Sequence, residues 1–441
     1  MLDKNVPQPW QGQTTLVFAL AAVAIGLGNL FRLPWLLGEH GGAPFFLAYL
    51  STLMLVTVPV MVAEVMLGSH GRGSPLGAMR WASDQSGRSI YWSWLGVVQA
   101  IAAMLLASQL LVLTVWLFDR AVVLNTGILA SASTIDVAEN FTAMIELAQP
   151  QWLKALCLLC ALTLLLAMGS QYALGFMAWL ILPALAVALM GLLDYSLAKG
   201  ALKPAGEYLF AQRYRDFHLE AALAGMGSAF FTLGAGLGIG LSFGARTPRR
   251  LTLLRSVMAA AVIDTTFAVT LAVVIVPLLF ATNTAISEGL SLVFVAIPYA
   301  FSNLPEGEVY GALFFGFAAL SGAATILALM EPGVMILRRE VGLSRWLAAA
   351  LLALMVFLMA GLSRFGPEWI KLALGAASQY LVVVGLLGIA VFVGWIVPRP
   401  IIRGELYREP RWLFALWWTM VRFVAPSAAL FWLLRNSFLF E

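Results

Sequence analysis

The chain has 441 residues, of which 61% are hydrophobic and 11% are charged. A soluble domain of this size could not bury so much apolar surface, so the composition excludes soluble enzymes and binding modules and predicts an integral membrane protein. The formal net charge of +4 does not indicate a nucleic-acid partner, because the basic residues follow the predicted membrane topology.

Eleven apolar segments are long enough to span a bilayer, and each is bounded by charged residues, proline or glycine. They are residues 14–36, 43–68, 92–118, 152–168, 173–197, 221–244, 252–281, 308–337, 344–362, 371–397 and 411–434. The first segment lacks the basic start and small-residue cleavage site of a signal peptide, so we expect it to remain in the mature protein.

The loops between these segments differ in charge from one side of the membrane to the other. With the N-terminus inside, the loops on its side hold most of the arginines, among them Arg72, Arg246, Arg250, Arg338 and Arg345. Positively charged loops remain in the cytoplasm, so we expect a multi-pass protein of the cell (inner) membrane with a cytoplasmic N-terminus. Eleven spans then place the C-terminus outside.

The first segment is interrupted by polar residues and glycines at 22–34, where Gly26, Gly28, Asn29 and Arg32 lie in an otherwise apolar run. A continuous spanning helix would avoid burying these residues unless an unwound backbone lined a cavity. Breaks of this kind are where transporters bind ions and substrates, so the sequence predicts a binding site here.

The fourth segment contains both cysteines, Cys157 and Cys160, among leucines. A metal or redox site would need further polar ligands, and the neighbouring sequence offers none, so we expect these thiols to pack against lipid or the core.

The sixth segment repeats the interruption of the first, with a glycine at every second position from 234 to 240. Gly-Leu-Gly occurs at 26–28 and again at 236–238, each time in the first helix of a candidate five-helix half. An odd number of helices per half inverts the second copy in the membrane. We therefore expect inverted repeats at 1–200 and 201–400, followed by an accessory helix at 401–441.

Several motifs resemble the neurotransmitter:sodium symporter family over nearly the whole chain. They are Trp10 and the runs Gly26 to Pro34, Gly41 to Tyr49, Pro59 to Gly68, Phe230 to Gly238, Ile297 to Phe301 and Met330 to Pro332. The resemblance implies the leucine-transporter fold, an all-α membrane protein with two inverted five-helix repeats and, here, one accessory helix. It also implies sodium-coupled import of amino acids by alternating access.

The resemblance implies two sodium sites, carried over residue by residue. The first would use the carbonyl of Ala24 and the side chains of Asn29, Thr232 and Asp264. The second would use the carbonyls of Ala22, Ile25 and Ser321 and the hydroxyl of Thr325. Ala324 stands where the family usually has another side-chain oxygen, so we expect weak sodium binding at the second site.

The resemblance also implies a substrate pocket at the breaks. Gly26 stands where amine-transporting members have an aspartate, so the chain resembles the amino-acid branch, whose substrates bring their own carboxylate. Backbone amides near Gly26 and Gly28, at the positive end of a half-helix, suit that carboxylate. The implied lining is almost entirely apolar and consists of Val23, Ala24, Leu106, Leu110, Phe231, Thr232, Gly234, Leu237, Thr325 and Leu329. Such a lining favours large aliphatic or aromatic amino acids.

Five further positions carry expectations from the family pattern. Arg32 and Phe231 match the outer gate, and Glu368 is the nearest acidic candidate to pair with Arg32. Leu110 replaces the tyrosine that normally caps the substrate. Glu64, in the second segment, is implied to brace the break of the sixth.

Asp264 departs from the family, which usually has an uncharged asparagine there. Three interpretations remain open: a sodium ligand that also replaces chloride, a protonatable coupling group, or a buried structural residue. On the first interpretation we expect sodium as the only coupling ion, with no chloride requirement.

Other functions remain as alternatives: a proton-coupled or sodium-independent amino-acid transporter, or a non-transporting sensor on the same fold. An enzyme is not expected, because the apolar segments contain no H-E-x-x-H motif and no paired carboxylates. The expected partners are the bilayer and an amino acid as the small-molecule substrate, without nucleic acid, and the expected assembly is a monomer or weak dimer.

Overall fold

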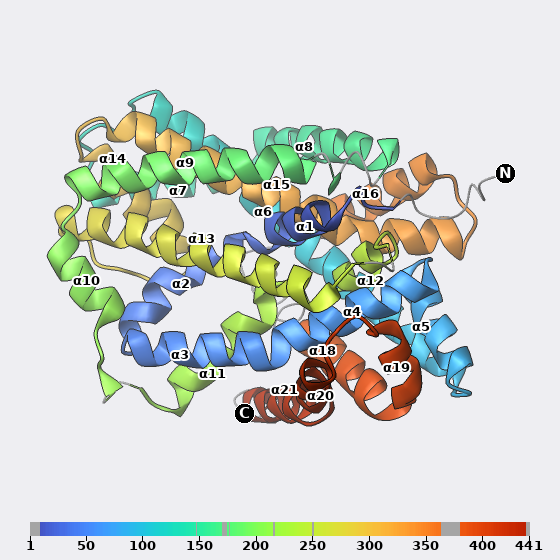
Figure 1. Ribbon diagram of the computed structural model, residues 1–441. Coiled ribbons are helices and arrows are strands. Elements are labelled where there is room, and N and C mark those ends of the chain that lie inside the picture. Colours follow the sequence, from blue (N-terminus) through green and yellow to red (C-terminus); the bar gives the residue numbers. More distant parts are fainter. Residues whose placement is uncertain are drawn as a thin grey trace.

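The computed structural model describes residues 9–146, 148–169, 174–175, 177–214, 217–248, 251–362 and 380–437. These residues are almost entirely helical, and the only pairing of extended backbone among them is an isolated bridge between Gly42 and Gln212. Figure 1 shows the long helices packed side by side, as expected for a chain that crosses a bilayer several times.

The first half of the chain contains the following helices, with short π- or 3-10 turns marked η. They are α1 (Gln13–Ala24), α2 (Leu27–Glu39), α3 (Ala43–Thr52), η1 (Leu53–Thr57), α4 (Val58–Gly71), α5 (Pro75–Gln85), η2 (Ile90–Ser93), α6 (Trp94–Asn125), α7 (Thr134–Glu146), α8 (Ala148–Met168) and α9 (Met177–Lys199). Cys157 and Cys160 are free and exposed on α8, which agrees with a lipid-facing position.

The second half follows the same convention. Its helices are α10 (Leu202–Phe210), α11 (Leu219–Thr232), α12 (Ile239–Gly244), α13 (Leu253–Ala281), η5 (Leu292–Ala296), α14 (Ile297–Ser302), α15 (Gly307–Arg339), α16 (Arg345–Gly361), α18 (Val382–Val391), η8 (Phe392–Ile396), α19 (Arg399–Glu405), α20 (Arg411–Thr419), η9 (Met420–Val424) and α21 (Ala425–Ser437).

Seven helices among the described residues are long and apolar enough to cross a membrane. They coincide with seven of the eleven predicted segments. The other four differ because the first and sixth are each divided into two short helices, the ninth has 17 residues, and the tenth is described only from residue 380 onward. The count of eleven spans therefore stays a prediction.

The two divided spans lie at the centre of the molecule. α1 packs against α13, α9 and α15, while α12 packs against α4 and α15, and α6 runs along α15. In Figure 1 the yellow α13 crosses beside α1, and α21, close to the C-terminus, packs against α18. Long helices therefore pack against the short helices next to both breaks.

Candidate functional site

The first break interrupts the backbone at Ile25 and Gly26, as the sequence predicts. Gly26 is extended (φ −102°, ψ 175°), and its amide donates to the Ala24 carbonyl (2.6 Å) instead of to Ala22, four residues back. The end of α1 therefore offers carbonyl oxygens, and the start of α2 offers amides near Gly28, to other partners.

The second break runs from Leu233 to Gly238, between α11 and α12. Gly234, Gly236 and Gly238 have φ angles of 70°, 85° and 71°, in the left-handed region that only glycine enters without strain. A Cβ on Gly236 would also lie 2.2 Å from the Val382 carbonyl oxygen. The glycines therefore permit both the unwound backbone and its close approach to α18.

Glu64 braces the second break. Its carboxylate is fully buried, and Oε1 accepts hydrogen bonds from the Gly236 amide (2.9 Å) and from Gln99 Nε2 (2.8 Å). An acceptor at this point satisfies a backbone amide that the missing helical turn leaves open. The contact expected from the sequence is confirmed.

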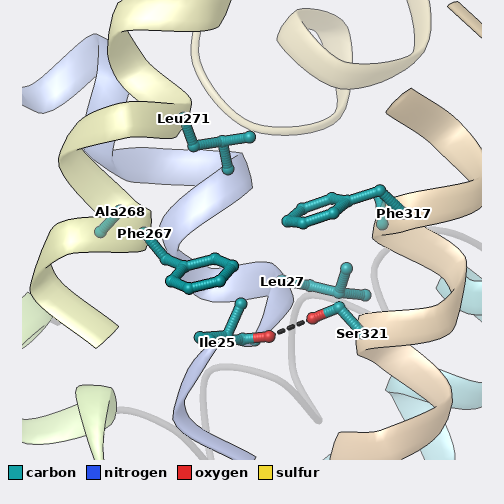
Figure 2. Close-up of a pocket in the computed structure, with 9 residues that line it drawn as sticks. Ile25, Leu27, Phe267, Ala268, Leu271, Phe317 and Ser321 are labelled. Atoms are coloured by element: carbon teal, nitrogen blue, oxygen red, sulfur yellow. Dashed lines mark hydrogen bonds between the residues drawn. The ribbon is translucent and has the colours of Figure 1, made fainter. Parts of the chain in front are cut away.

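The first break and α15 meet at a group of oxygen atoms, of which Figure 2 shows the Ile25 carbonyl and the Ser321 hydroxyl. The Ser321 hydroxyl donates to the Ile25 carbonyl, while Thr325 Oγ1 donates to the Ser321 carbonyl (3.0 Å) and approaches the Val23 carbonyl (3.4 Å). The structure thus brings together Ile25, Ser321 and Thr325 of the predicted second sodium site. Oxygen ligands of this kind suit a hard cation.

Ser321 contributes more to this group than the sequence indicates. Its carbonyl alone was an expected ligand, yet its hydroxyl also contacts the break. A second side-chain oxygen is therefore present despite Ala324, which removes the physical reason for expecting weak sodium binding there. The signal in the sequence was a serine one helical turn before Thr325.

A small cavity of about 10 Å³ adjoins this group on the side of α13. Figure 2 shows Phe267 and Leu271 of α13 facing Phe317 of α15 across it, with Ile25 and Ser321 at its edge. Its room matches about one water molecule. Of the expected substrate-lining residues only Gly26 borders it, so the predicted pocket between α6, α11 and α15 stays a prediction.

The predicted first sodium site gathers around a residue that sequence reasoning missed, Tyr49. Its hydroxyl hydrogen-bonds Thr232 Oγ1 (3.2 Å). Tyr49 and Asp264 are both fully buried. The structure therefore pairs Thr232 with Tyr49 and buries Asp264 on α13, whereas the Asn29 side chain lies outside the described part of the structure.

The expected gate residues are only partly described. Arg32 is exposed on α2 and forms no ion pair with a described residue, and Phe231 is partly buried at the end of α11. Glu368 lies outside the described residues. The outer gate stays a prediction.

A buried ion cluster lies where the segment before α1 meets α12, α15 and α16. Glu331 of α15 is fully buried and pairs with Arg246, which follows α12, and with Arg345 at the start of α16 (2.9 Å). The Arg246 guanidinium lies 5.9 Å from the ring of Trp10, whose amide donates to the Arg246 carbonyl (2.9 Å). We call these four residues the inner cluster.

The inner cluster joins several elements that are far apart in the sequence. Trp10 Nε1 also donates to the Phe243 carbonyl (3.0 Å), and Arg345 Nε donates to the Leu166 carbonyl on α8 (2.8 Å). Sequence reasoning treated Arg246 and Arg345 only as markers of the cytoplasmic side. Their shared carboxylate could not be foreseen, because 85 residues separate Arg246 from Glu331.

Comparisons with known proteins agree with this geometry. Residues 8–118 match the model of the sodium:neurotransmitter symporter family. The chain is 26% identical to an uncharacterized sodium-dependent transporter, YhdH, of Bacillus subtilis, over 97% of both chains. It is 23% identical to an uncharacterized sodium-dependent transporter of Haemophilus influenzae, over 98% of both.

A solved structure shows a similar fold. The crystal structure of MhsT in complex with L-phenylalanine superposes with a TM-score of 0.86 at 26% identity, covering 97% of this chain and 99% of that chain.

Proposed function

Because this chain belongs to the neurotransmitter:sodium symporter family, we propose that it imports hydrophobic or aromatic amino acids together with sodium. It is a sodium-dependent membrane transporter and not an enzyme, since the family consists of transporters.

One observation carries the proposal: the oxygen group where the first break meets α15. Ile25, Ser321 and Thr325 bring together carbonyl and hydroxyl oxygens at a point where the backbone is unwound. Sodium bound there would hold α1 and α15 together, so its binding would favour one conformation over another. This is the differential affinity that coupling requires.

The substrate proposal rests on the apolar lining and on the open amides of α2. The MhsT structure contains L-phenylalanine, a substrate type that such a lining would also suit in this chain.

We assign closure of the cytoplasmic side to the inner cluster. Its bonds link the segment before α1 to α12, α15 and α16, so opening a path from the breaks to that side requires separating them. Alternating access then consists of breaking this cluster while the opposite side closes.

The direct test is uptake into proteoliposomes of labelled amino acids under separate gradients of sodium, potassium and protons. We expect a sodium gradient to drive accumulation of phenylalanine or leucine, and neither potassium nor a pH gradient to replace it. Strong accumulation of only small polar or charged amino acids would contradict the substrate class. Accumulation driven equally well by a proton gradient without sodium would contradict the coupling ion.

Removing the Ser321 hydroxyl should weaken sodium binding. Ser321→Ala deletes the side-chain oxygen that contacts the Ile25 carbonyl, and we expect the half-saturating sodium concentration to rise about tenfold, equivalent to about 1.4 kcal/mol. Thr270→Ala is the matched control, because its hydroxyl bonds only the Thr266 carbonyl on an exposed face of α13. Equal sodium dependence in both variants would show that the Ser321 hydroxyl is not a ligand.

A further inference from the structure

Arg422 is a charged residue on an outer face of the molecule that the transport proposal does not use. It lies in η9, within the last apolar span, and is partly exposed. No hydrogen bond or ion pair joins its guanidinium to any described residue, and its Nε is buried without a partner. A cation at a lipid-facing position needs a counter-charge or access to the interface.

Aromatic rings hold this guanidinium in place. Its Cζ lies 4.6 Å from the ring centroid of Trp395 and 5.5 Å from that of Phe423. Trp395 Nε1 also donates to the Arg422 carbonyl (2.7 Å), which the π-helical turn leaves available. Both rings are about half exposed, at 52% and 51%. The charge is therefore fixed between rings that themselves face the surroundings.

The close approach of two helices builds this arrangement. Trp395 lies in η8 beside Gly394, where a Cβ would come within 2.8 Å of the Arg422 Cα. Two π-helical turns, η8 and η9, thus meet at a glycine contact. The contact between η8 and η9 therefore fixes where the Arg422 side chain lies.

Trp395 lies next to the cytoplasmic-side end expected for the tenth apolar segment, residues 371–397. Trp395 is one residue before the end of η8 at Ile396, and the following connection carries the exposed Arg399, Arg408 and Arg411. Tryptophan and arginine at a helix end mark the membrane–water interface, and clustered basic residues there attract anionic lipid.

We propose that Trp395, Arg422 and Phe423 form a binding site for the phosphate group of an anionic phospholipid. The guanidinium supplies the donors that fit a phosphodiester, and the two exposed rings pack against the lipid backbone and chains. The neighbouring arginines select anionic over zwitterionic lipid. This site lies where η8 meets η9 and does not depend on the identity of the transported substrate.

The test is native mass spectrometry of the purified full chain titrated with phosphatidylglycerol, phosphatidylcholine or inorganic phosphate. We expect the wild type to retain phosphatidylglycerol more strongly than phosphatidylcholine. Arg422→Leu should weaken phosphatidylglycerol binding about tenfold, and Arg422→Lys should weaken it less. Arg435→Leu is the control, because Arg435 is an exposed arginine near the other end of the same span.

Equal phosphatidylglycerol binding by wild type and Arg422→Leu would overturn the proposal. An equal loss in Arg435→Leu would show general charge attraction, and displacement of the lipid by millimolar inorganic phosphate would show a site for a soluble anion. If Arg422→Leu does not fold, two other measurements replace it. Trp395→Leu should also bind phosphatidylglycerol more weakly than the wild type, and phosphatidylglycerol should raise the melting temperature of the wild type more than phosphatidylcholine does. A wild type stabilised equally by both lipids would overturn the anionic preference.

Discussion

Glu331→Gln is expected to abolish net uptake while the protein remains in the membrane. Each carboxylate oxygen of Glu331 contacts an arginine, and all three side chains are largely buried. Breaking a buried ion pair from one side costs roughly 3–5 kcal/mol, because the remaining charges stay buried without compensation. A loss of about 3 kcal/mol in the closed state alone would shift the conformational equilibrium more than 100-fold toward a state open on the cytoplasmic side.

Hydrogen–deuterium exchange measured together with uptake would reveal this shift. Exchange should increase in the segment from Trp10 through α1, which the inner cluster anchors, while α6 stays protected. Glu340→Gln is the matched control, since its pair with Arg80 is partly exposed and such pairs contribute at most about 1 kcal/mol. Wild-type uptake and exchange in Glu331→Gln would show that the cluster does not close this side.

The positions of both breaks were predictable from sequence because each depends on local chemistry. Glycines and polar residues in an apolar segment conflict with a continuous helix, and the structure interrupts the backbone at Ile25–Gly26 and at Leu233–Gly238. The short helices α5, α7, α10, α14 and α19 were not predicted, because each is too short for a span. Their formation depends on packing against the long helices.

The contacts between distant segments were not predictable in the same way. The contacts of Tyr49, Ser321 Oγ and the inner cluster form only when separate helices pack together. A single sequence does not show which helices pack against each other. The resemblance to a family supplied candidate ligands but treated Ser321 as a carbonyl ligand only. It also assigned no role to Arg246, which forms a buried ion pair with Glu331. The division into repeats at residues 200 and 400 stays a prediction.

Asp264→Asn is expected to make transport depend on chloride or to eliminate it. Asp264 is fully buried on α13, and Thr232 is bonded by the buried Tyr49 hydroxyl. A sodium ion placed next to Thr232 would introduce a positive charge into a region of low dielectric, and an isolated charge there costs several kcal/mol. The Asp264 carboxylate can balance that charge permanently, so we propose that the wild type does not need chloride.

Uptake should therefore be unaffected in the wild type when gluconate replaces chloride. In Asp264→Asn the uptake measured in gluconate should fall at least tenfold, and added chloride should restore part of it if the anion can enter the same region. Asp194→Asn serves as the control, because Asp194 is an exposed carboxylate on α9. The apparent sodium affinity of the wild type should also fall as the pH is lowered, since a proton and sodium would compete for one carboxylate.

A second variant separates charge balance from direct ligation. Ala268 lies one helical turn from Asp264 on α13 and is buried next to Gly26 and Leu27. In the double variant Asp264→Asn, Ala268→Glu, a carboxylate returns to the region without occupying the original position. If Asp264 acts only as the balancing charge, the double variant should transport without chloride. If the aspartate must touch sodium, uptake should stay low in both anions. Wild-type uptake that requires chloride, or an Asp264→Asn variant with unchanged uptake at every pH, would show that this aspartate is not the balancing charge.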